Sequence, residues 1–412
     1  MLSAKFPYPA TLGGTQIRTF YFLKALSDRH NVTLLTVREP DISDQQIEGL
    51  KSYVQDLILF DPPAKPPSGP LAKAQRLGQF LLNGTPANVT AYDDPKIRAW
   101  IDQAVAENRF DAITCEHSVN AVFIRPEYRK KLRTVINVHS SETCTIASKL
   151  ALGISEKPSR DRLLLPLTRR YETNSYRNFT DIVVTTNIDD QQIRAMVPTA
   201  QPNIIPNGVL LEEFTLQTQE PANHQLIFTG TFDYSINIDT ARHLALDILP
   251  RLQERYPDVT LAIVGSKPDP TVQALTRNPN VIVTGRVPSL ADWLHQSLLF
   301  VAPMRSGFGI KNKTLEAMAA GLPIVGSDRA LEGLLMDEAD APGTPLRALR
   351  ANDTDTTVAA ICRLFEDADL RSTLAKNARH YIEEQFTWSR AGEAYCRILE
   401  RPSEAKPYPE QP

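Results

Sequence analysis

The stretch GFGIKNKTLEAMAAGLPIVGSD, residues 307–328, combines glycines, lysines and one glutamate in an order that suits a phosphorylated ligand. Its two glycines follow the apolar run LLFVAPM, and a glycine turn after a strand lets backbone N–H groups and a helix N-terminus approach a phosphate. Lys311 and Lys313 can balance the charge of that phosphate. A phosphate would repel Glu316, so this carboxylate suits a position one step away, where it accepts hydrogen bonds from ribose hydroxyls. The stretch therefore predicts a nucleotide-like ligand.

The same stretch predicts a helix that begins near Ile310. Apolar and small residues recur along one face, which we expect to pack: Ile310, Thr314, Ala317, Met318 and Gly321. Glu316 lies off this face, beside Asn312 and Lys313, so its carboxylate should face solvent or a cleft. A plainer interpretation stays open, because glycines often only form turns and a glutamate near a lysine is often a surface i,i+3 pair.

A partial dinucleotide fingerprint is a rival interpretation of this stretch. GFGIKN follows a strand and precedes a helix, and Asp328 stands at the end of the next strand, about 20 residues on. Asn312 occupies the position of the third glycine of that fingerprint. An NAD-dependent dehydrogenase therefore stays open as an alternative function.

A second glycine turn, Gly13-Gly14, opens the segment TLGGTQIRTFYFLKAL near the start of the chain. Apolar residues then recur with helical spacing at Ile17, Phe20 and Leu23. Because ligands of open parallel sheets bind beyond the carboxyl ends of the strands, two such turns predict one ligand held between two domains.

Short runs rich in Val, Ile and Leu alternate with amphipathic segments, which is typical of βαβ units and parallel sheets. We expect strands at 31–37, 56–60, 111–115, 134–138, 181–186, 225–230, 259–265, 281–285, 298–304 and 323–327. The segment VPTAQPNIIPNGVLLEEF interrupts both periodicities and predicts a linker. The predicted organisation is an N-terminal domain 1–205, a C-terminal domain 206–384, a last amphipathic helix 385–400 and a disordered tail 401–412.

Composition limits the classes of function. The net charge of −3 over 412 residues lacks the basic excess of a nucleic-acid-binding protein. The four cysteines form no CxxC pair, which favours reduced thiols in a cytoplasm and no structural metal. We expect neither a signal peptide nor a membrane span. Segments 71–82 and 160–170 mix basic and apolar residues with helical spacing, so peripheral contact with a membrane surface stays open beside the plainer interpretation of solvated helix faces.

With these residues in view, the chain resembles the group 1 family of retaining GT-B glycosyltransferases over almost its whole length. The resemblance rests on GGTQIR, IPNGVLLEEF, LIFTGTFDY, the segment 281–327 and the closing FTWSRAGEAY. Within the family, FPYP, GIKNKTLEAMA and RALEGL are most similar to sugar transferases of bacterial exopolysaccharide clusters.

The resemblance implies an α/β GT-B fold, in which two Rossmann-like doubly wound domains face a cleft and the last helix crosses back to the N-terminal domain. It also implies a cytoplasmic retaining glycosyltransferase that takes a UDP- or GDP-sugar, needs no metal or other cofactor, and acts on a glycan, lipid-linked or small-molecule acceptor. Biosynthesis of a polysaccharide or glycoconjugate at the inner membrane surface would be its setting.

The resemblance also assigns roles to residues. The donor would lie mostly on the C-terminal domain and the acceptor on the N-terminal domain. Glu316 would hold the ribose, the backbone near Val287 would pair with the base, the amides of Gly309, Ile310 and Lys311 would meet phosphate, Gly14 would close on the diphosphate, and Gly230 with Thr231 would line the donor pocket.

Two departures from the family pattern concern the donor. Phe308 stands eight positions before Glu316, where the family commonly has a glutamate that contacts the donor sugar. The usual Arg and Lys after the first C-domain strand are absent from GTFDYSINID. Other cations could replace them: Arg18, Lys267, Arg305, Lys311 and Lys313.

Glycosyl transfer needs stabilisation of a departing nucleoside diphosphate, and we assign this to Lys311 or, failing that, to Arg305. No carboxylate pair suits a glycosidase. His117 and His139 each follow an N-domain strand and could touch acceptor or phosphate. We favour a role for His139 and a strand-end position for His117. A nucleotide-sugar epimerase of similar fold and a non-catalytic nucleotide- or glycan-binding relative stay open as alternatives.

Overall fold

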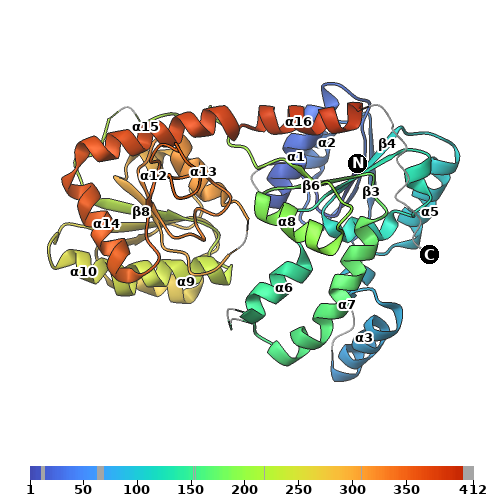
Figure 1. Ribbon diagram of the computed structural model, residues 1–412, viewed down its shortest axis with the longest axis horizontal. Coiled ribbons are helices and arrows are strands. Elements are labelled where there is room, and N and C mark those ends of the chain that lie inside the picture. The colour runs from blue at the N-terminus through green and yellow to red at the C-terminus, as the bar shows by residue number, and fades with distance from the viewer. Residues whose placement is uncertain are drawn as a thin grey trace. The chain divides into compact units, whose positions relative to one another are not determined.

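The computed structural model describes residues 1–10, 14–62, 69–151, 153, 155–217, 219–307 and 309–401 of the chain (Figure 1). Contacts divide the chain into two compact units, one of Met1–Pro206 with Ala391–Pro412 and one of Asn207–Arg390. The boundary expected near residue 206 thus falls between Pro206 and Asn207. Gly13 and Phe308 lie outside the described residues, as does the expected tail beyond Arg401.

The first unit contains a seven-stranded parallel sheet in the order β3-β2-β1-β4-β5-β6-β7. Its strands are β1 Leu2–Ser3, β2 Thr33–Val37, β3 Asp56–Phe60, β4 Ala112–Glu116, β5 Arg133–Asn137, β6 Asp181–Val184 and β7 Asn203–Ile204. Leu2 pairs with Leu35 on one side and Cys115 on the other, so the strand order reverses at β1. A reversal of this kind opens a crevice at the carboxyl edge of the sheet.

Helices cover both sheets of the protein. Those of the first unit are α1 Gly14–Ser27, α2 Asp44–Lys51, α3 Pro70–Asn83, α4 Ala87–Thr90, α5 Pro95–Ala106, α6 Glu142–Ala151, α7 Pro158–Tyr176 and α8 Asn187–Met196. Local sequence fixes several of their starts: Ser43 with Gln46 forms a capping box on α2, and Thr186 with Asp189 forms one on α8.

The second unit contains a six-stranded parallel sheet in the order β10-β9-β8-β11-β12-β13. Its strands are β8 Gln225–Thr229, β9 Thr260–Val264, β10 Val281–Val283, β11 Leu299–Ala302, β12 Ile324–Gly326 and β13 Leu349–Arg350. Every residue of β9 from Leu261 to Val264 is fully buried, as expected for an apolar strand covered on both faces. The strand order reverses between β8 and β11, which places a second crevice there.

Helices lie on both faces of this second sheet, with α9 and α10 on one face and α13 and α15 on the other (Figure 1). The helices are α9 Ser235–His243, α10 Leu249–Gln253, α11 Pro270–Gln273, α12 Leu290–His295, α13 Asn312–Ala319, α14 Thr354–Glu366 and α15 Ala368–Gln385. A π-helical segment, Leu244–Ile248, joins α9 to α10.

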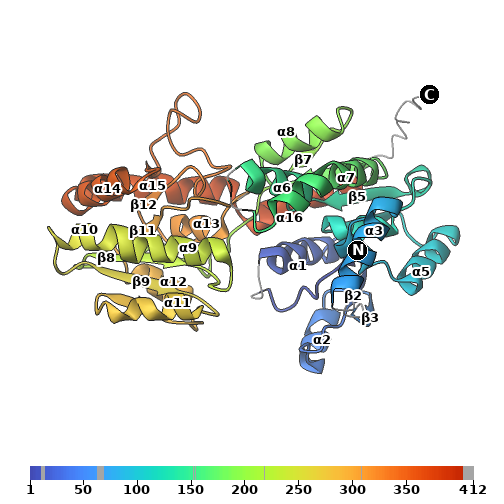
Figure 2. The same ribbon diagram turned by 90° about the horizontal axis from the view of Figure 1, so that it is seen from below.

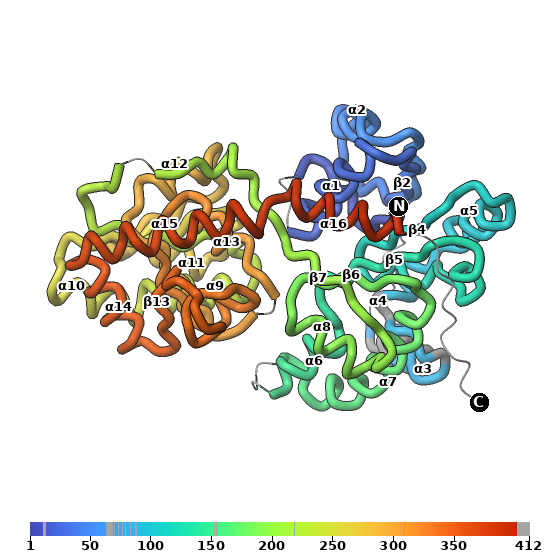
Figure 3. The backbone as a smooth tube through the Cα atoms, turned by 45° about the horizontal axis from the view of Figure 1, so that its top comes forward, coloured from blue at the N-terminus to red at the C-terminus, as the bar shows by residue number. Residues whose placement is uncertain are grey.

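The last helix, α16 Trp388–Glu400, follows directly on α15 in Figure 3 and returns the chain to the first unit. It lies along α1 (Figure 2), where a Cβ on Gly392 would come within 2.4 Å of the Ala25 Cβ. Only a glycine lets the two helices approach so closely. The predicted GT-B type of architecture, two doubly wound domains and a returning C-terminal helix, is therefore confirmed.

Candidate functional site

Two glycines shape the carboxyl edge of the second sheet. Gly230 follows β8 and Gly265, with φ +147°, follows β9; a Cβ on Gly265 would lie 1.8 Å from the Gly230 carbonyl oxygen. A Cβ on Gly230 would lie 2.8 Å from Asn237 Nδ2 and 2.9 Å from Lys313 Nζ. Gly265 therefore excludes a side chain, and a Cβ at Gly230 would displace the polar ends of Asn237 on α9 and Lys313 on α13, which lie against the partly buried Gly230 backbone.

The polar groups at this edge form one connected cluster. Lys313 Nζ donates to Asn237 Oδ1 at 2.6 Å and lies 4.4 Å from the centroid of the Phe228 ring. Asn237 Nδ2 donates to the Thr231 carbonyl at 2.8 Å. These contacts hold the ammonium in place over the end of β8, where it can meet an anionic ligand. The predicted donor-site residues Gly230, Thr231 and Lys313 are thus brought together.

Enclosure shifts the pKa values of Lys313 and Glu316 towards each other. Burial lowers the pKa of Lys313 to about 7, with the charge of Glu316 opposing the shift. Burial raises the pKa of Glu316 to about 7, with Lys313 opposing and Glu213 adding to the shift. Titratable groups displaced this far are concentrated at functional sites, because burial without a ligand is costly to both charges.

Helix α13 begins at Asn312, two residues later than the sequence predicted, and Lys311 is its N-cap residue. The reason is local: Gly309 adopts φ +69° and Lys311 is extended, so the helical turn starts only after them. The expected packing face is buried, with Thr314, Ala317 and Met318 fully enclosed. The first amides of α13 point away from the helix and suit an anion.

Glu332, which the sequence did not indicate, contacts the loop before α13. Glu332 Oε1 accepts the Gly309 N–H at 3.1 Å, and Glu332 Oε2 lies 3.9 Å from Lys311 Nζ. Lys311 Nζ also donates to the Gly309 carbonyl. Gly309, Ile310 and Lys311 therefore form a loop next to the cluster, with the Lys311 ammonium drawn towards the loop backbone.

Other predicted donor residues lie elsewhere on the second unit. Arg305 is exposed, and its guanidinium donates two hydrogen bonds to the Asp239 carboxylate, one of them from Nε to Oδ2 at 3.0 Å. Val287 follows the turn at Gly285 after β10 and packs against the core of the unit. Lys267 pairs with Asp233 at 3.1 Å. Carboxylates hold both of these cations at 3.0–3.1 Å, whereas Lys311 Nζ lies 3.9 Å from Glu332 and Lys313 Nζ donates to the neutral Asn237 amide, so Lys311 and Lys313 suit a phosphate better.

A buried polar network lies at the carboxyl edge of the first sheet. Arg18 Nε donates to Asn137 Oδ1 at 3.1 Å, and Asn137 Nδ2 donates to Glu116 Oε2 at 2.7 Å. Tyr395 of α16 donates to Glu116 Oε1 at 2.7 Å and stacks on Phe22 with ring centroids 4.2 Å apart. Burial lowers the pKa of Arg18 to about 10 and raises the pKa of Glu116. Arg18 is 1% exposed, so it faces the interior of its unit.

The two histidines of the first unit are neighbours. His117 and His139 follow β4 and β5, and their ring centroids lie 5.3 Å apart. His117 has φ +83°, an uncommon conformation for a residue with a side chain. Burial lowers the pKa of both rings, and Arg18 and His117 lower that of His139 further. Both rings are therefore neutral near pH 7 and have a nitrogen that can accept a hydrogen bond.

Two ring nitrogens of this histidine pair, His117 Nδ1 and His139 Nε2, are buried without a hydrogen-bond partner among the described residues.

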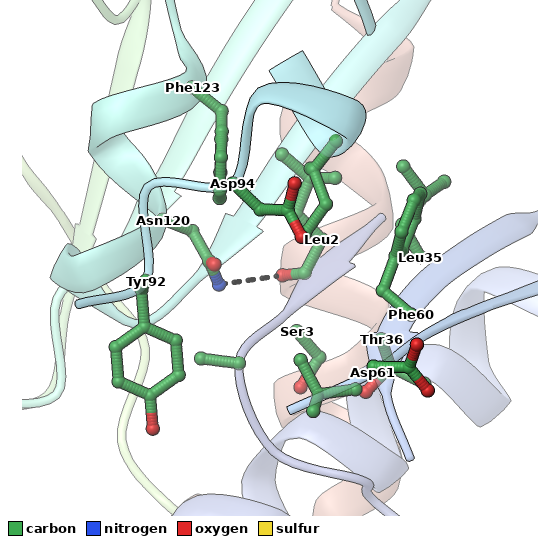
Figure 4. Close-up of a pocket in the computed structure, with 13 residues that line it drawn as sticks. Leu2, Ser3, Leu35, Thr36, Phe60, Asp61, Tyr92, Asp94, Asn120 and Phe123 are labelled. Carbon is green, nitrogen blue, oxygen red and sulfur yellow. Dashed lines mark hydrogen bonds between the residues drawn. The ribbon is translucent and has the colours of Figure 1, made fainter. Parts of the chain in front are cut away.

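Gly14, the other predicted residue of this unit, begins α1 and is exposed. A mainly apolar cavity lies at the end of β1 and β2, and Tyr92 and Phe123 are among the residues that line it (Figure 4). Asn120 Nδ2 closes one wall by donating to the Leu2 carbonyl at 3.3 Å.

Fold and site together define an α/β protein of two doubly wound units, with a polar, glycine-shaped crevice in the second. The model described as Glycosyltransferase Family 4 matches residues 12–213, and the model described as Glycosyl transferases group 1 matches residues 223–367. The chain belongs to the group 1 glycosyltransferases with the GT-B fold, as its sequence predicted.

Curated relatives are similar over part of the chain. A phosphatidyl-myo-inositol mannosyltransferase of Mycolicibacterium smegmatis is 27% identical over 211 residues, 49% of this chain and 52% of that protein. A putative glycosyltransferase of Bacillus subtilis, YtcC, is 26% identical over 162 residues, 36% of this chain and 39% of that protein. The matched region thus spans about half, or less, of the length of these relatives.

Solved structures share the fold over nearly the whole chain. Sucrose-phosphate synthase from Thermosynechococcus elongatus superposes with a TM-score of 0.66 at 19% identity, covering 97% of each chain. HepE of Anabaena in complex with UDP and glucose superposes with a TM-score of 0.64 at 13% identity, covering 97% of this chain and 98% of that one.

In the described part of the chain, no helix combines the length and apolar character needed to cross a membrane.

Proposed function

We propose that this chain transfers a sugar from a nucleotide-sugar donor, with retention of anomeric configuration and without a metal. The observation that carries the proposal is the cluster of Gly230, Asn237, Lys313 and Glu316 at the crevice of the second sheet. There a partly buried ammonium and a partly buried carboxylate lie on one helix, next to a backbone position that has no side chain. The ammonium suits a phosphate and the carboxylate suits ribose hydroxyls.

The donor we propose is a UDP- or GDP-sugar. HepE, which shares the fold at 13% identity, has been solved in complex with UDP and glucose. The local support for the diphosphate is the N-terminus of α13 with the amides of Ile310 and Lys311, beside Gly309, whose own N–H donates to Glu332. Glu316 would serve the ribose and the turn at Val287 the base. Gly14 of the first unit would act on the same diphosphate.

The costly event in the proposed reaction is the departure of the nucleoside diphosphate. Amides and ammonium groups that are already in place stabilise the charge that develops on the leaving oxygen. Lys311 would serve this role once its Nζ turns from the Gly309 carbonyl to the phosphate. Arg305 would first have to leave Asp239.

On the acceptor side we propose a role for His139, whose neutral ring can accept a hydrogen bond from the acceptor or contact the phosphate. The departing phosphate itself would take the acceptor's proton. A His139→Ala enzyme with unchanged kinetics would remove this role. The proposed acceptor is a glycan or a lipid-linked glycan, in exopolysaccharide or glycoconjugate biosynthesis.

Exposed leucines of the first unit favour peripheral contact of the cytoplasmic protein with the inner membrane surface. Leu71 and Leu82 of α3 are 75% and 86% exposed, and Leu163 of α7 is 55% exposed between the exposed residues Arg162 and Pro166. Apolar side chains beside arginines suit an anionic lipid surface.

Release of nucleoside diphosphate from UDP- and GDP-sugars, measured with lipid and glycan acceptors, tests the proposed reaction. We expect acceptor-dependent release, and a fall in kcat on the order of 100-fold for Lys311→Ala, because one leaving-group donor is lost. Lys376→Ala, which removes an exposed lysine of α15, is the matched control and should keep full activity. Release without any acceptor would favour a hydrolase, and conversion of the donor into an isomeric nucleotide-sugar without release would favour an epimerase. Unchanged turnover of Lys311→Ala would remove its role.

A further inference from the structure

Glu332 is a buried acid beside the loop that precedes α13, and nothing above gives it a chemical role. It follows β12 and its side chain is only 7% exposed. Its Oε1 accepts the Gly309 N–H at 3.1 Å, so one carboxylate oxygen faces the loop proposed to bind the diphosphate. The second oxygen, Oε2, lies 3.9 Å from Lys311 Nζ and 3.6 Å from Arg329 Nη1.

The oxygen Oε2 of Glu332 is buried and accepts no hydrogen bond from the described residues. Both neighbouring cations attract it, yet both stand beyond ordinary hydrogen-bond distance. An ionised carboxylate has room for about four donors, and a buried acceptor without a donor destabilises the fold because it has lost its water and gained no partner. An acceptor left open at this position is therefore suited to a donor that arrives with a ligand.

The chemistry of the neighbouring groups narrows what that donor is. A carboxylate repels phosphate, so the group that meets Oε2 must be neutral and must carry a proton. In a nucleotide-sugar, hydroxyls occur on the ribose and on the transferred sugar. Glu316, seven residues after Gly309, suits the ribose, and the Gly309–Lys311 loop suits the diphosphate between the two sugars. The hydroxyls that remain for Glu332 belong to the transferred sugar.

We propose that Glu332 Oε2 accepts a hydrogen bond from a hydroxyl of the transferred sugar and thereby selects the donor. This inference rests on the proposed function. The same side chain would position the Gly309 amide through Oε1 and recognise the sugar through Oε2. A site built to bond a hydroxyl discriminates strongly against a sugar that lacks it, because the buried oxygen is then left unpaired.

Glu332→Gln separates recognition from loop positioning. Its amide oxygen can still accept the Gly309 N–H, while its NH₂ group replaces the open acceptor with a donor. Glu338→Gln is the matched control, since it removes the same charge from an exposed residue of the same unit. Unfolding midpoints without ligand establish that both variants are folded.

The experiment compares dissociation constants for a nucleoside diphosphate and for its sugar derivatives by calorimetry: UDP with UDP-glucose, UDP-galactose and UDP-N-acetylglucosamine, and GDP with GDP-mannose. We expect the wild type to bind one sugar derivative more tightly than its nucleoside diphosphate. Glu332→Gln should bind the nucleoside diphosphate as the wild type does and lose at least about tenfold in affinity for the sugar derivative, while Glu338→Gln changes neither.

Equal losses for both ligands in Glu332→Gln would show that Glu332 only positions the loop, and would overturn the proposal. A wild type that binds a nucleoside diphosphate but gains nothing from any sugar would also overturn it, leaving the proposed nucleotide site intact. A wild type that binds no nucleotide would overturn the proposed function and this inference together.

A test on the wild type alone avoids any dependence on the folding of the variant. Among donors that lack one sugar hydroxyl at a time, we expect one to bind the wild type at least about tenfold more weakly than the parent donor. A series in which every single deoxy donor binds like its parent contradicts the proposal.

Discussion

At the scale of single residues, the site depends on groups that tolerate no replacement. Gly265 lies so close to the Gly230 carbonyl that it cannot carry a Cβ, and burial moves the pKa values of Lys313 and Glu316 far from their ordinary values. The sequence indicated Gly230, Lys313 and Glu316. It did not indicate Gly265, Asn237 or Glu332, because their roles arise from contacts with residues distant in the chain, such as the bond between Asn237 and Lys313 across 76 positions.

Gly265→Ala should destabilise the second unit strongly. The new Cβ would overlap the Gly230 carbonyl and occupy φ +147°, so we expect a loss of roughly 3 kcal/mol or more in the free energy of unfolding. Gly343→Ala is the control: its φ is +77° but no atom lies within 4 Å, so only backbone strain of about 1 kcal/mol applies. Guanidinium denaturation measures both, and equal losses would contradict the close crossing.

The raised pKa of Glu316 predicts how stability without ligand depends on pH. The pKa of Glu316 is about 7 in the folded protein and 4.5 in its ordinary state. The neutral carboxyl therefore contributes fully to the free energy of unfolding below about pH 4.5, and this contribution is lost as the pH rises through about 7. Glu316→Gln keeps a neutral side chain. Its unfolding midpoint relative to the wild type should therefore rise between about pH 5 and pH 8.

The exposed variant Glu338→Gln, measured over the same pH range, shows how much of that rise is general loss of negative charge. A constant difference between wild type and Glu316→Gln across the range would mean that Glu316 is not enclosed as described.

At the scale of elements, the positions of strands and helices were largely predictable from alternating apolar runs and amphipathic segments. The start of α13 was not, since Gly309 at φ +69° and the extended Lys311 delay the helix. The network of Arg18, Asn137, Glu116 and Tyr395 was also beyond sequence reasoning. Arg18 looked like a phosphate ligand, and only the fold shows that β5 brings Asn137 onto it.

Tyr395→Phe tests how this network holds α16 on the first unit. The change leaves Glu116 Oε1 without the Tyr395 donor inside the protein, so we expect a loss of about 1–3 kcal/mol in the free energy of unfolding. Amides of α16 beyond Ala391 should also exchange faster with solvent. Tyr234→Phe, at an exposed tyrosine, is the control and should change stability by less than about 0.5 kcal/mol. Unchanged exchange in α16 would argue against an anchoring role of the network.

At the scale of the whole molecule, each unit has its own parallel sheet, its own buried core and its own crevice at a reversal of strand order. The chain passes between the units twice, after Pro206 and after Arg390. The segments next to these two points contact each other: Val209 N–H donates to the Phe386 carbonyl at 2.8 Å, and a Cβ on Gly208 would lie 2.2 Å from the Trp388 nitrogen. The groups proposed to hold the nucleotide, apart from Gly14, all belong to the second unit.

Thermal unfolding of the wild type and Glu316→Ala with UDP, GDP, ADP and NADH tests the central claim most directly. A ligand at about 100 times its dissociation constant adds about 2.7 kcal/mol, which moves the midpoint by a few degrees. We predict that UDP or GDP raises the midpoint of the wild type and that Glu316→Ala loses the rise. Stabilisation by NADH alone, or by no nucleotide, would contradict a nucleotide-sugar site at this crevice.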